Sequence, residues 1–205
     1  MSINPLLATP WKVVNELRRL ALLPYARAYF ALHGVRWQAG WKVYGCPLIQ
    51  RHAGSSIELG ERLQLRSWFG SNPLGVNHRI VLATWAAGAE IRIGNQVGLT
   101  GTTLCAETAI HIGDRVRIGA NSMVADSDFH PIDIAERRAN PKGGVSRPIA
   151  VEDDVFIGMH VLILKGVTIG QGSVVGAGSV VSHSVPPGVV VAGNPARIIR
   201  ELEPA

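Results

Sequence analysis

An aliphatic side chain returns at every sixth residue in the C-terminal half of this chain. The positions are Val151, Ile157, Ile163, Ile169, Val175 and Val181, six apart without a slip. An α-helix repeats near 3.6 residues and a strand near 2, so neither element alone explains the spacing. A fixed longer period indicates a repeating structural unit, which constrains the fold more than any other feature of the sequence.

Each group of six residues is predicted to form one short side and one corner of a coil. The key aliphatic residue and the residue two before it share one face of a short strand. Val155 and Ile157 are therefore expected to face inward and Phe156 outward. Gly158 follows directly, where a corner leaves little room for a side chain. Three such sides would close one coil, and stacked coils would share a continuous aliphatic core.

The repeat extends over most of the chain, with two irregularities. The repeat begins near Ile57. In its first half the six-residue step holds at Ile93, Leu99 and Cys105, and again at Ile112, Ile118 and Val124. One extra residue between Cys105 and Ile112 resets the spacing. A polar loop at 127–150 interrupts it again. We therefore predict a helical N-terminal cap at 1–55, a repeat domain at 56–200 that contains this loop, and a tail at 201–205.

The N-terminal segment has a different pattern. The stretch WKVVNELRRLALLPYARAYFALHG has apolar residues at helical spacing, and Pro24 should divide it into two short helices. A helix here would cap the open end of the coil stack, as repeat proteins require. The alternative interpretation is a helix that makes a weak contact with a membrane surface, because Lys12, Arg18, Arg19 and Arg27 lie beside leucines.

Composition limits the classes of function. The 205 residues carry a formal net charge of +5, which is compatible with an anionic small ligand, a nucleic acid or a membrane surface. No Lys/Arg block resembles a nucleic-acid-binding arm, so we expect no nucleic-acid partner. Cys46 and Cys105 have no metal-ligand spacing and indicate reduced thiols. With no recognisable leader or span, the expected location is the cytoplasm, at most peripheral to the inner face of the membrane.

The repeat and three local stretches resemble the hexapeptide-repeat acyltransferases. The stretches are IHIGDRVRIGANSMVADSDFHPID, VEDDVFIGMHVLILKGVTIGQGSVVGAGSVV and VPPGVVVAGNPARIIR. In this order they are similar to the sugar O-acetyltransferase branch of the maltose and galactoside type, and LTGTTLCAETAIHIGD is closer to relatives associated with surface polysaccharide. The resemblance implies a mainly β fold, a left-handed parallel β-helix with the short helical cap, assembled as a homotrimer with acetyl-CoA as cosubstrate.

His130 is the predicted catalytic base. Acyl transfer from a thioester to a hydroxyl needs a group that accepts the hydroxyl proton, and neutral histidine suits this task. The family's catalytic histidine falls in the DSDFHP motif, which places the role at His130. Asp126 and Asp128 flank it, either as carboxylates that orient the imidazole or as turn-forming residues. The resemblance places the oxyanion donor at the backbone N–H of Met159.

The resemblance also implies a coenzyme A groove along the coils, against a neighbouring subunit. Its predicted contacts are Gly158, Lys165, Ala177, Ser179, His183, Arg197 and Arg200. Ala177 and Ser179 lie in the GAGS turn that meets the pantetheine arm in the family, and the arginines suit phosphate. His183 stands where the family often has lysine.

The acceptor site is less readable. The asparagine that some relatives carry in the coil before the histidine coil is absent from LTGTT, and Asn77 and His78 could supply a polar group instead. Trp68, Phe69 and Trp85 could stack on a sugar face, or pack internally. Arg137 and Arg138 belong to the loop, where they could bind an anionic acceptor or simply face solvent.

Three other functions compete with a CoA-dependent transfer of acetyl to a sugar hydroxyl of a surface polysaccharide or its precursor. A γ-type carbonic anhydrase shares the coil fold, but its metal needs histidine ligands, two of them five residues apart. No two residues among His78, His111, His130, His160 and His183 have that spacing, so we expect no metal. A non-catalytic scaffold on this fold would lack the histidine or the groove residues. An acyltransferase with a serine or amino-sugar acceptor stays open, because an amine also needs a base.

Overall fold

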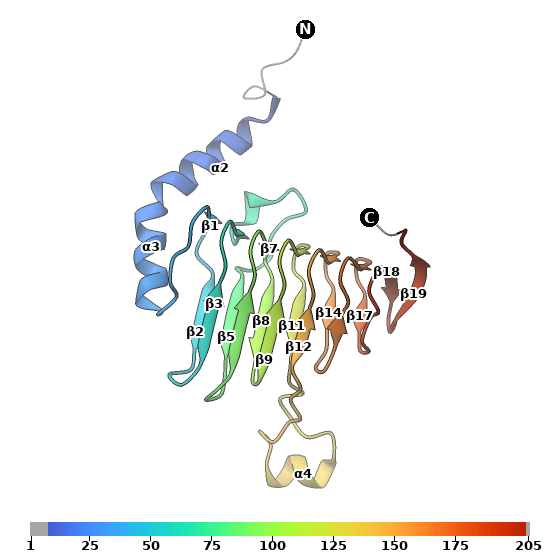
Figure 1. The fold of residues 1–205 in the computed structure, drawn as a ribbon. Coiled ribbons are helices and arrows are strands. Elements are labelled where there is room, and N and C mark those ends of the chain that lie inside the picture. The colour runs from blue at the N-terminus through green and yellow to red at the C-terminus, as the bar shows by residue number, and fades with distance from the viewer. Residues whose placement is uncertain (1–7, 204–205) are drawn as a thin grey trace.

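The structure, a computed structural model, describes residues 8–203 as a three-sided stack of parallel strands (Figure 1). Successive strands pass from sheet A to sheet B to sheet C, and each strand pairs with its equivalent one coil later. Sheet A contains β1 (Lys42–Tyr44), β4 (Gln64–Arg66), β7 (Gly98–Thr100), β10 (Arg117–Ile118), β13 (Phe156–Ile157), β16 (Val174–Val175), β18 (Val189–Gly193) and the antiparallel β19 (Ala196–Glu201). Sheet B contains β2 (Leu48–Arg51), β5 (Val81–Thr84), β8 (Thr103–Ala106), β11 (Met123–Ala125), β14 (Leu162–Ile163) and β17 (Val180–Val181). Sheet C contains β3 (Ser56–Leu59), β6 (Glu90–Ile93), β9 (Ala109–Ile112), β12 (Ile149–Val151) and β15 (Thr168–Ile169).

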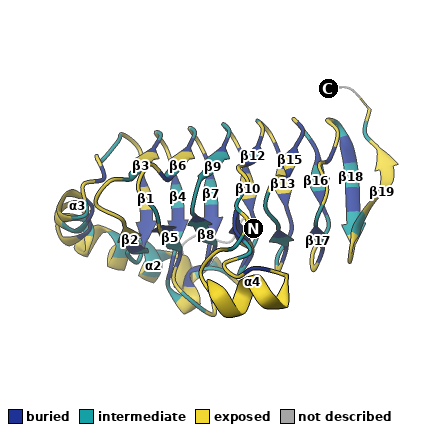
Figure 2. Ribbon diagram, turned by 90° about the horizontal axis from the view of Figure 1, so that it is seen from below, coloured by how far each residue is buried: buried dark blue, intermediate teal, exposed yellow. Residues whose placement is uncertain are grey.

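The strand register confirms the predicted three sides per coil. Val151 pairs with Ile169, and Ile157 pairs with Val175, each eighteen residues along the chain. Ile163 pairs with Val181 in the same way. All of these residues are buried, and they form one core that runs through the stack. Figure 2 shows the strands as largely buried and the protruding helix α4 as exposed.

One residue of the predicted repeat is wrong. Cys105 was expected in the core, but Leu104 is the residue that pairs with Val124 and is fully buried, while Cys105 is only partly buried. The step from Leu99 to Leu104 is five residues, because the corner at Gly101 is tight: its φ is +51°, in the region that favours glycine. The extra residue lies after this corner, where β8 continues to Ala106.

Two helices precede the coil, as Pro24 predicted. Helix α2 covers Pro10–Ala21 and helix α3 covers Leu23–Leu32, with Pro24 in the first turn of α3, where its missing N–H costs no hydrogen bond. In α3, Phe30 is buried against Trp37 and Trp41 at ring-centroid distances of 5.7 and 5.1 Å. Helix α3 therefore covers the open end of the stack, whereas α2 extends away from it (Figure 1).

The coil begins earlier than the predicted boundary at residue 55. Strand β1 already pairs with β4 in full register, and β2 pairs with β5, so the first turn starts at Lys42. The six-residue repeat is hard to recognise in this turn, because its sequence is rich in aromatic residues. Residues 1–7 and 204–205 lie outside the described part of the chain, so most of the predicted tail is not covered. None of the helices within residues 8–203 is long and apolar enough to span a membrane.

Candidate functional site

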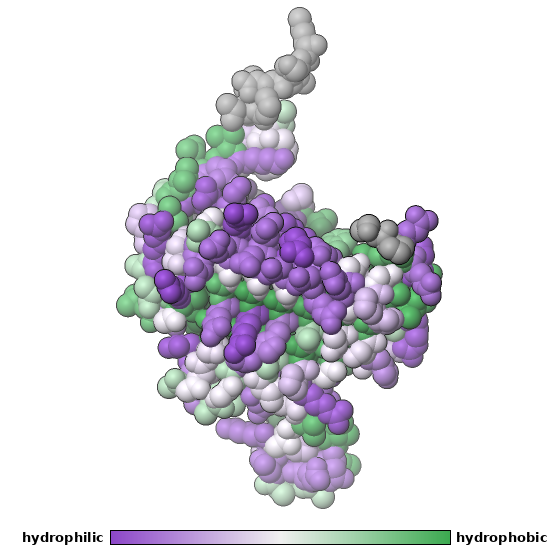
Figure 3. Space-filling model, in the orientation of Figure 1, coloured by the Kyte–Doolittle hydropathy of each residue, from purple (hydrophilic) through white to green (hydrophobic). Residues whose placement is uncertain are grey.

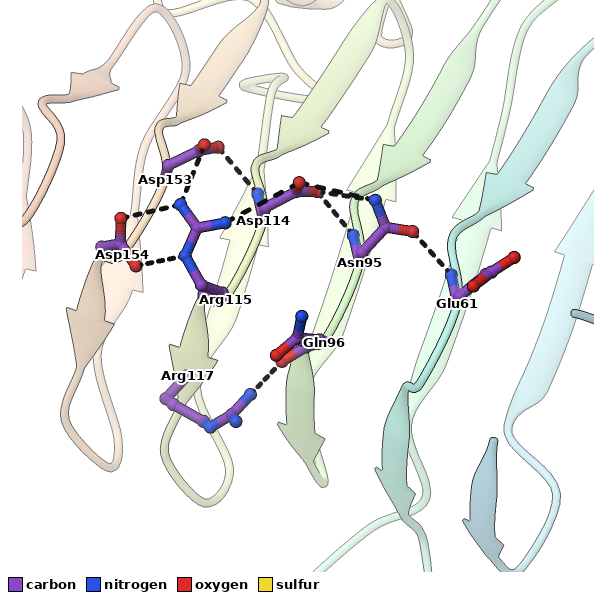
Figure 4. A network of polar contacts seen from close by, with 8 residues as sticks. All are labelled: Glu61, Asn95, Gln96, Asp114, Arg115, Arg117, Asp153 and Asp154. Atoms are coloured by element: carbon purple, nitrogen blue, oxygen red, sulfur yellow. Dashed lines mark hydrogen bonds and ion pairs between the residues drawn. The ribbon is translucent and has the colours of Figure 1, made fainter. Parts of the chain in front are cut away.

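The coil has three corners, and one of them is occupied by a structural ladder. At the corner between sheets C and A, the side chains of Asn95, Asp114 and Asp153 each accept a hydrogen bond from a backbone N–H one coil below (Figure 4). The distances are 2.9, 2.6 and 2.8 Å. Arg115 adds ion pairs to Asp153 and Asp154. These contacts use the polar groups of this corner, and the predicted site residues lie elsewhere.

The corner between sheets B and C carries the loop with His130. This loop leaves the coil after β11 and contains a short helix, α4 (Ile134–Ala139), before β12 resumes the stack (Figure 1). His130 is exposed, and its Nδ1 lies 2.5 Å from the carbonyl oxygen of Pro141. A carbonyl can only accept, so Nδ1 must carry the proton and Nε2 of a neutral imidazole has a free lone pair. This is the tautomer that a base acting through Nε2 requires.

The backbone before His130 is held in a sparsely populated conformation. Phe129 has φ of +61°, which is uncommon for a residue with a bulky side chain. Its N–H donates to Ser127 Oγ at 3.0 Å, and the N–H of His130 donates to the carbonyl of Asp128 at 2.7 Å. Such strain persists where surrounding contacts determine the backbone, and it is frequent at functional sites.

The predicted orienting role of Asp126 does not fit its surroundings. Asp126 is fully buried, and its carboxylate accepts hydrogen bonds from the backbone N–H groups of Glu107, Thr108 and Ala109 and from the Thr108 hydroxyl, at 2.7–2.8 Å. Four donors satisfy both oxygens, so none of this capacity is left for the imidazole. Asp126 fastens the coil below to the start of the loop.

Asp128 is also engaged elsewhere. Its Oδ1 lies 2.5 Å from Nζ of Lys165, and both side chains are about three-quarters buried. Lys165, predicted to contact a coenzyme phosphate, thus belongs to the His130 corner and ties the loop to the coil above. Within residues 8–203 the imidazole's hydrogen-bond partner is the Pro141 carbonyl rather than either carboxylate.

The sequence analysis missed three contacts that hold this loop: two between Glu107 and serine hydroxyls, and one between His130 and the Pro141 carbonyl. Glu107 accepts hydrogen bonds from the hydroxyls of Ser127 and Ser146, at 2.5 and 2.6 Å, which closes the base of the loop. Glu107 lies nineteen residues before Asp126, about one turn of the coil. Counting whole turns along the sequence could therefore have placed it next to the loop. The Pro141 carbonyl is a backbone group, and no residue type announces it.

Most of the other predicted residues lie at the corner between sheets A and B. Gly158 is stacked below Ala177: a Cβ on Gly158 would come within 2.6 Å of the Ala177 nitrogen, so only glycine fits. Gly178 N–H donates to the Met159 carbonyl at 2.8 Å, and Ser179 Oγ accepts from Gly193 N–H at 3.1 Å. Ser179 is buried, which makes its side chain a structural bridge, while Ala177 is exposed.

The predicted basic residues divide between the ends of the strands. Arg197 is exposed and pairs with Ala192, near the corner between sheets A and B. Arg200 is exposed but pairs with Val190, at the other end of β18. His183 follows β17 and therefore lies at the His130 corner, where its Nδ1 contacts Ser182 Oγ at 3.0 Å.

Within one chain, His130 and the Met159 amide lie at opposite ends of sheet B. Met159 follows β13 and precedes β14, whereas His130 follows β11 and precedes β12. The four residue steps from Ser122 to Asp126 cross the sheet, which is roughly 13 Å at about 3.3 Å per residue. A single thioester carbonyl cannot contact both groups of the same chain.

A cavity lies beside the corner between sheets A and B, which also carries Met159. It has a volume of about 810 Å³ and is bounded by α2, the segment with the short helix η1 (Phe69–Ser71), and the outer face of sheet A. It reaches Gly119, which packs closely under Met159: a Cβ on Gly119 would lie 2.6 Å from the Met159 nitrogen, so only glycine fits there.

The aromatic and polar candidates for the acceptor are distributed over two regions. Trp85 is 62% exposed, and its ring centroid lies 6.0 Å from that of Phe129, the residue before His130. Trp68 packs against Tyr44, and Phe69 lies at the mouth of the large cavity. His78 contacts Thr103 Oγ1 at 3.1 Å at the corner between sheets A and B, and burial lowers its pKa.

Neither loop arginine makes a contact that indicates a ligand. Arg137 donates to the carbonyls of Pro131 and Ile132 at 2.8 and 2.9 Å, which orders the turn after His130. Arg138 is exposed near the end of α4. In the part of the chain that the structure describes, no three His, Cys, Asp or Glu side chains are grouped as metal ligands.

Comparisons with known proteins agree with the predicted repeat. The pattern of the hexapeptide repeat of succinyl-transferase matches residues 109–134 and 148–183. Galactoside O-acetyltransferase of Escherichia coli K12 is 42% identical over 116 residues, which cover 56% of this chain and 56% of that enzyme. The chain spans about half the length of the curated relatives it matches.

Two solved structures are similar to this chain. A galactoside acetyltransferase in complex with coenzyme A is 30% identical, with a TM-score of 0.54, and the match covers 81% of this chain and 65% of that one. A hexapeptide-repeat acetyltransferase of Vibrio cholerae complexed with acetyl-CoA is also 30% identical, covers 84% of this chain and 70% of its own, and has a TM-score of 0.49. The chain belongs to the hexapeptide-repeat family and its relatives named here are acetyltransferases, which confirms the predicted resemblance.

Proposed function

We propose that this protein is a CoA-dependent O-acetyltransferase that transfers acetyl from acetyl-CoA to a sugar hydroxyl, with His130 as the base. The observation that carries the proposal is the Pro141 carbonyl at His130 Nδ1, which leaves Nε2 free to accept a proton. The galactoside acetyltransferase with coenzyme A bound supports the donor, and the Escherichia coli galactoside O-acetyltransferase supports a sugar acceptor, which we propose belongs to a surface polysaccharide or its precursors.

The reaction would be a direct transfer. Nε2 of His130 takes the hydroxyl proton as the oxygen attacks the thioester carbon, and the Met159 N–H stabilises the oxyanion. The intermediate then breaks the carbon–sulfur bond, and the departing thiolate takes the proton from the imidazolium. A cysteine acyl-enzyme is disfavoured at Cys105, because burial, with the nearby Asp126 and Glu107 carboxylates, raises the pKa of its thiol to about 11.

The site would be completed between subunits of a homotrimer. Since His130 and Met159 lie at opposite ends of sheet B, the His130 corner of one subunit would face the Met159 corner of the next. Coenzyme A would lie in the groove between them, along Gly158 and Ala177, with Arg197 near its phosphates. We also infer that the coil is left-handed, which the family resemblance supports.

The first test is a reaction of the purified protein with acetyl-CoA and a panel of galactosides and maltosides, followed through release of free CoA thiol. Thiol release that requires both substrates would support the proposal, and an amino-sugar arm would separate O- from N-acetylation. A ligand at a hundred times its Kd stabilises the folded state by about 2.7 kcal/mol. If millimolar acetyl-CoA left the melting temperature unchanged, the donor assignment would be wrong.

Trp85 should contribute to acceptor binding. Its exposed ring beside Phe129 offers an apolar face within reach of the His130 corner, and such stacking is worth about 0.5–1.5 kcal/mol. We expect Trp85→Ala to raise KM for the sugar about three- to tenfold while KM for acetyl-CoA stays constant. The matched control is Tyr25→Ala, an equally exposed aromatic on α3, and an equal effect of both substitutions would contradict a stacking role.

Lys165 and Asp128 should act as one unit that positions the loop. We expect Lys165→Met and Asp128→Asn each to lower kcat about tenfold, and the double variant to be no slower than either, because each substitution breaks the same ion pair. Steady-state kinetics with acetyl-CoA as the varied substrate provide the measurement. If Lys165→Met raised KM for acetyl-CoA and Asp128→Asn did not, Lys165 would instead be a phosphate ligand.

A further inference from the structure

Helix α2 is attached to the coil through its polar side. Nδ2 of Asn15 donates to the Gly70 carbonyl at 2.9 Å, and the Glu16 carboxylate accepts from the hydroxyl of Tyr44. Nε of Arg19 pairs with the same carboxylate at 2.8 Å. Burial raises the pKa of Tyr44, with the Glu16 contact acting in the same direction, so the phenol keeps the proton it donates. These contacts fix which side of α2 faces the protein.

The apolar side of α2 therefore faces outward. Val14, Leu17 and Leu20 are 45%, 63% and 52% exposed, and no residue of the helix is buried. A helix on a globular protein ordinarily turns its apolar stripe to the core and its charges to water. Here the arrangement is reversed, and Figure 3 shows hydrophobic surface along the outer side of α2. We call Val14, Leu17, Leu20 and Ala21 the outer face of α2.

The charge of the N-terminal segment indicates what covers this face. Residues 8–41 contain five basic residues and one acidic residue, Glu16, so they hold +4 of the formal charge of +5. Arg18 is exposed one turn after Val14, beside the outer face, whereas the exposed Lys12 lines the cavity between α2 and the coil. From residue 42 onward the chain has 15 basic and 14 acidic residues, so the coil of a second copy offers no excess of negative charge. Anionic lipid headgroups do.

We propose that the outer face of α2 docks on an anionic lipid surface, with the helix lying in the plane of the headgroups. Apolar burial and attraction of basic residues to anionic lipid together give such helices their affinity. The polar contacts of Asn15 and Glu16 hold the helix in this orientation before it meets a membrane.

Co-sedimentation of the full-length protein with lipid vesicles tests this proposal without any assay of activity. One vesicle set is pure phosphatidylcholine, and the other contains 30% phosphatidylglycerol. We expect binding to the anionic vesicles at least tenfold stronger than to the neutral ones, and weaker at high salt. Equal or absent binding to both vesicle sets would overturn the proposal.

Variants identify the surface. Val14→Glu/Leu17→Glu should reduce binding to the anionic vesicles at least tenfold, and Lys12→Gln/Arg18→Gln should reduce it several-fold. The matched control is Leu32→Glu on α3, at 86% exposure and away from the outer face, which should bind normally. Light scattering without lipid completes the test. If Val14→Glu/Leu17→Glu instead lowered the molar mass of the assembly, a second copy would cover the face and the lipid assignment would be wrong.

Discussion

His130→Ala is expected to lower kcat/KM for the sugar acceptor by a factor of 10² to 10⁴. A positioned general base contributes about that much, which corresponds to roughly 2.7–5.5 kcal/mol of the activation free energy. The imidazole is exposed, and its hydrogen-bond partner is the Pro141 carbonyl, so its removal breaks no buried network. We expect the fold and the stabilisation by acetyl-CoA to be unchanged, as measured by thermal melting.

The matched control is His111→Ala. His111 lies on β9 in sheet C, where its Nε2 pairs with Glu90 at 2.5 Å, and it is no part of either candidate corner. Its replacement should leave turnover near normal. A His130→Ala variant that retained more than about a third of the activity would remove His130 from the mechanism, whatever its effect on stability.

The six-residue repeat predicted the coil because its aliphatic positions are the residues buried in the core. Ile157 and Val175 are eighteen residues apart, and they are neighbours in sheet A because three sides of six residues close one turn. The pattern failed where corner lengths changed, as at Leu104 and Cys105, because a five-residue step moves the inward position by one. It also failed at β1 and β2, where the buried Val43 and Ile49 keep the six-residue spacing but stand in a short stretch with Trp41 and Tyr44 beside them.

The candidate site was predictable in its residues but not in their grouping. The DSDFHP motif located His130, yet the flanking carboxylates look equivalent in the sequence. Only the structure separates Asp126, which binds backbone N–H groups, from Asp128, which pairs with Lys165. Lys165 and Met159 lie at different corners because one strand, β14, separates them. That assignment requires following the strands around the coil, and no single motif contains this information.

The orientation of α2 could not be read from its periodicity. An amphipathic helix has the same hydrophobic pattern whether its apolar side faces the core or the solvent. The contacts of Asn15 and Glu16 with the coil settle the orientation, because they hold the polar side inward. The structure thus assigns to α3 the capping role that sequence reasoning gave to the whole N-terminal segment.

Asp126→Ala is expected to lower the free energy of unfolding by about 4 kcal/mol or more. The substitution leaves the N–H groups of Glu107, Thr108 and Ala109 without their acceptor at a buried corner, and each such loss costs about 1–3 kcal/mol. For a chain of this length, 1 kcal/mol corresponds to about 2–4 °C, so the melting temperature should fall by about 8–16 °C.

Thermal and urea unfolding provide the measurement, with Asp133→Ala as the control. Asp133 is also a side-chain acceptor for a backbone N–H, that of Glu136 at 2.9 Å, but it is exposed at the start of α4 in the protruding loop. Its loss should cost about 1 kcal/mol or less, because water replaces the carboxylate. If Asp126→Ala unfolded at the normal temperature but lost its turnover, Asp126 would take part in the proton chemistry, and its assignment as the fastening of the loop would be wrong.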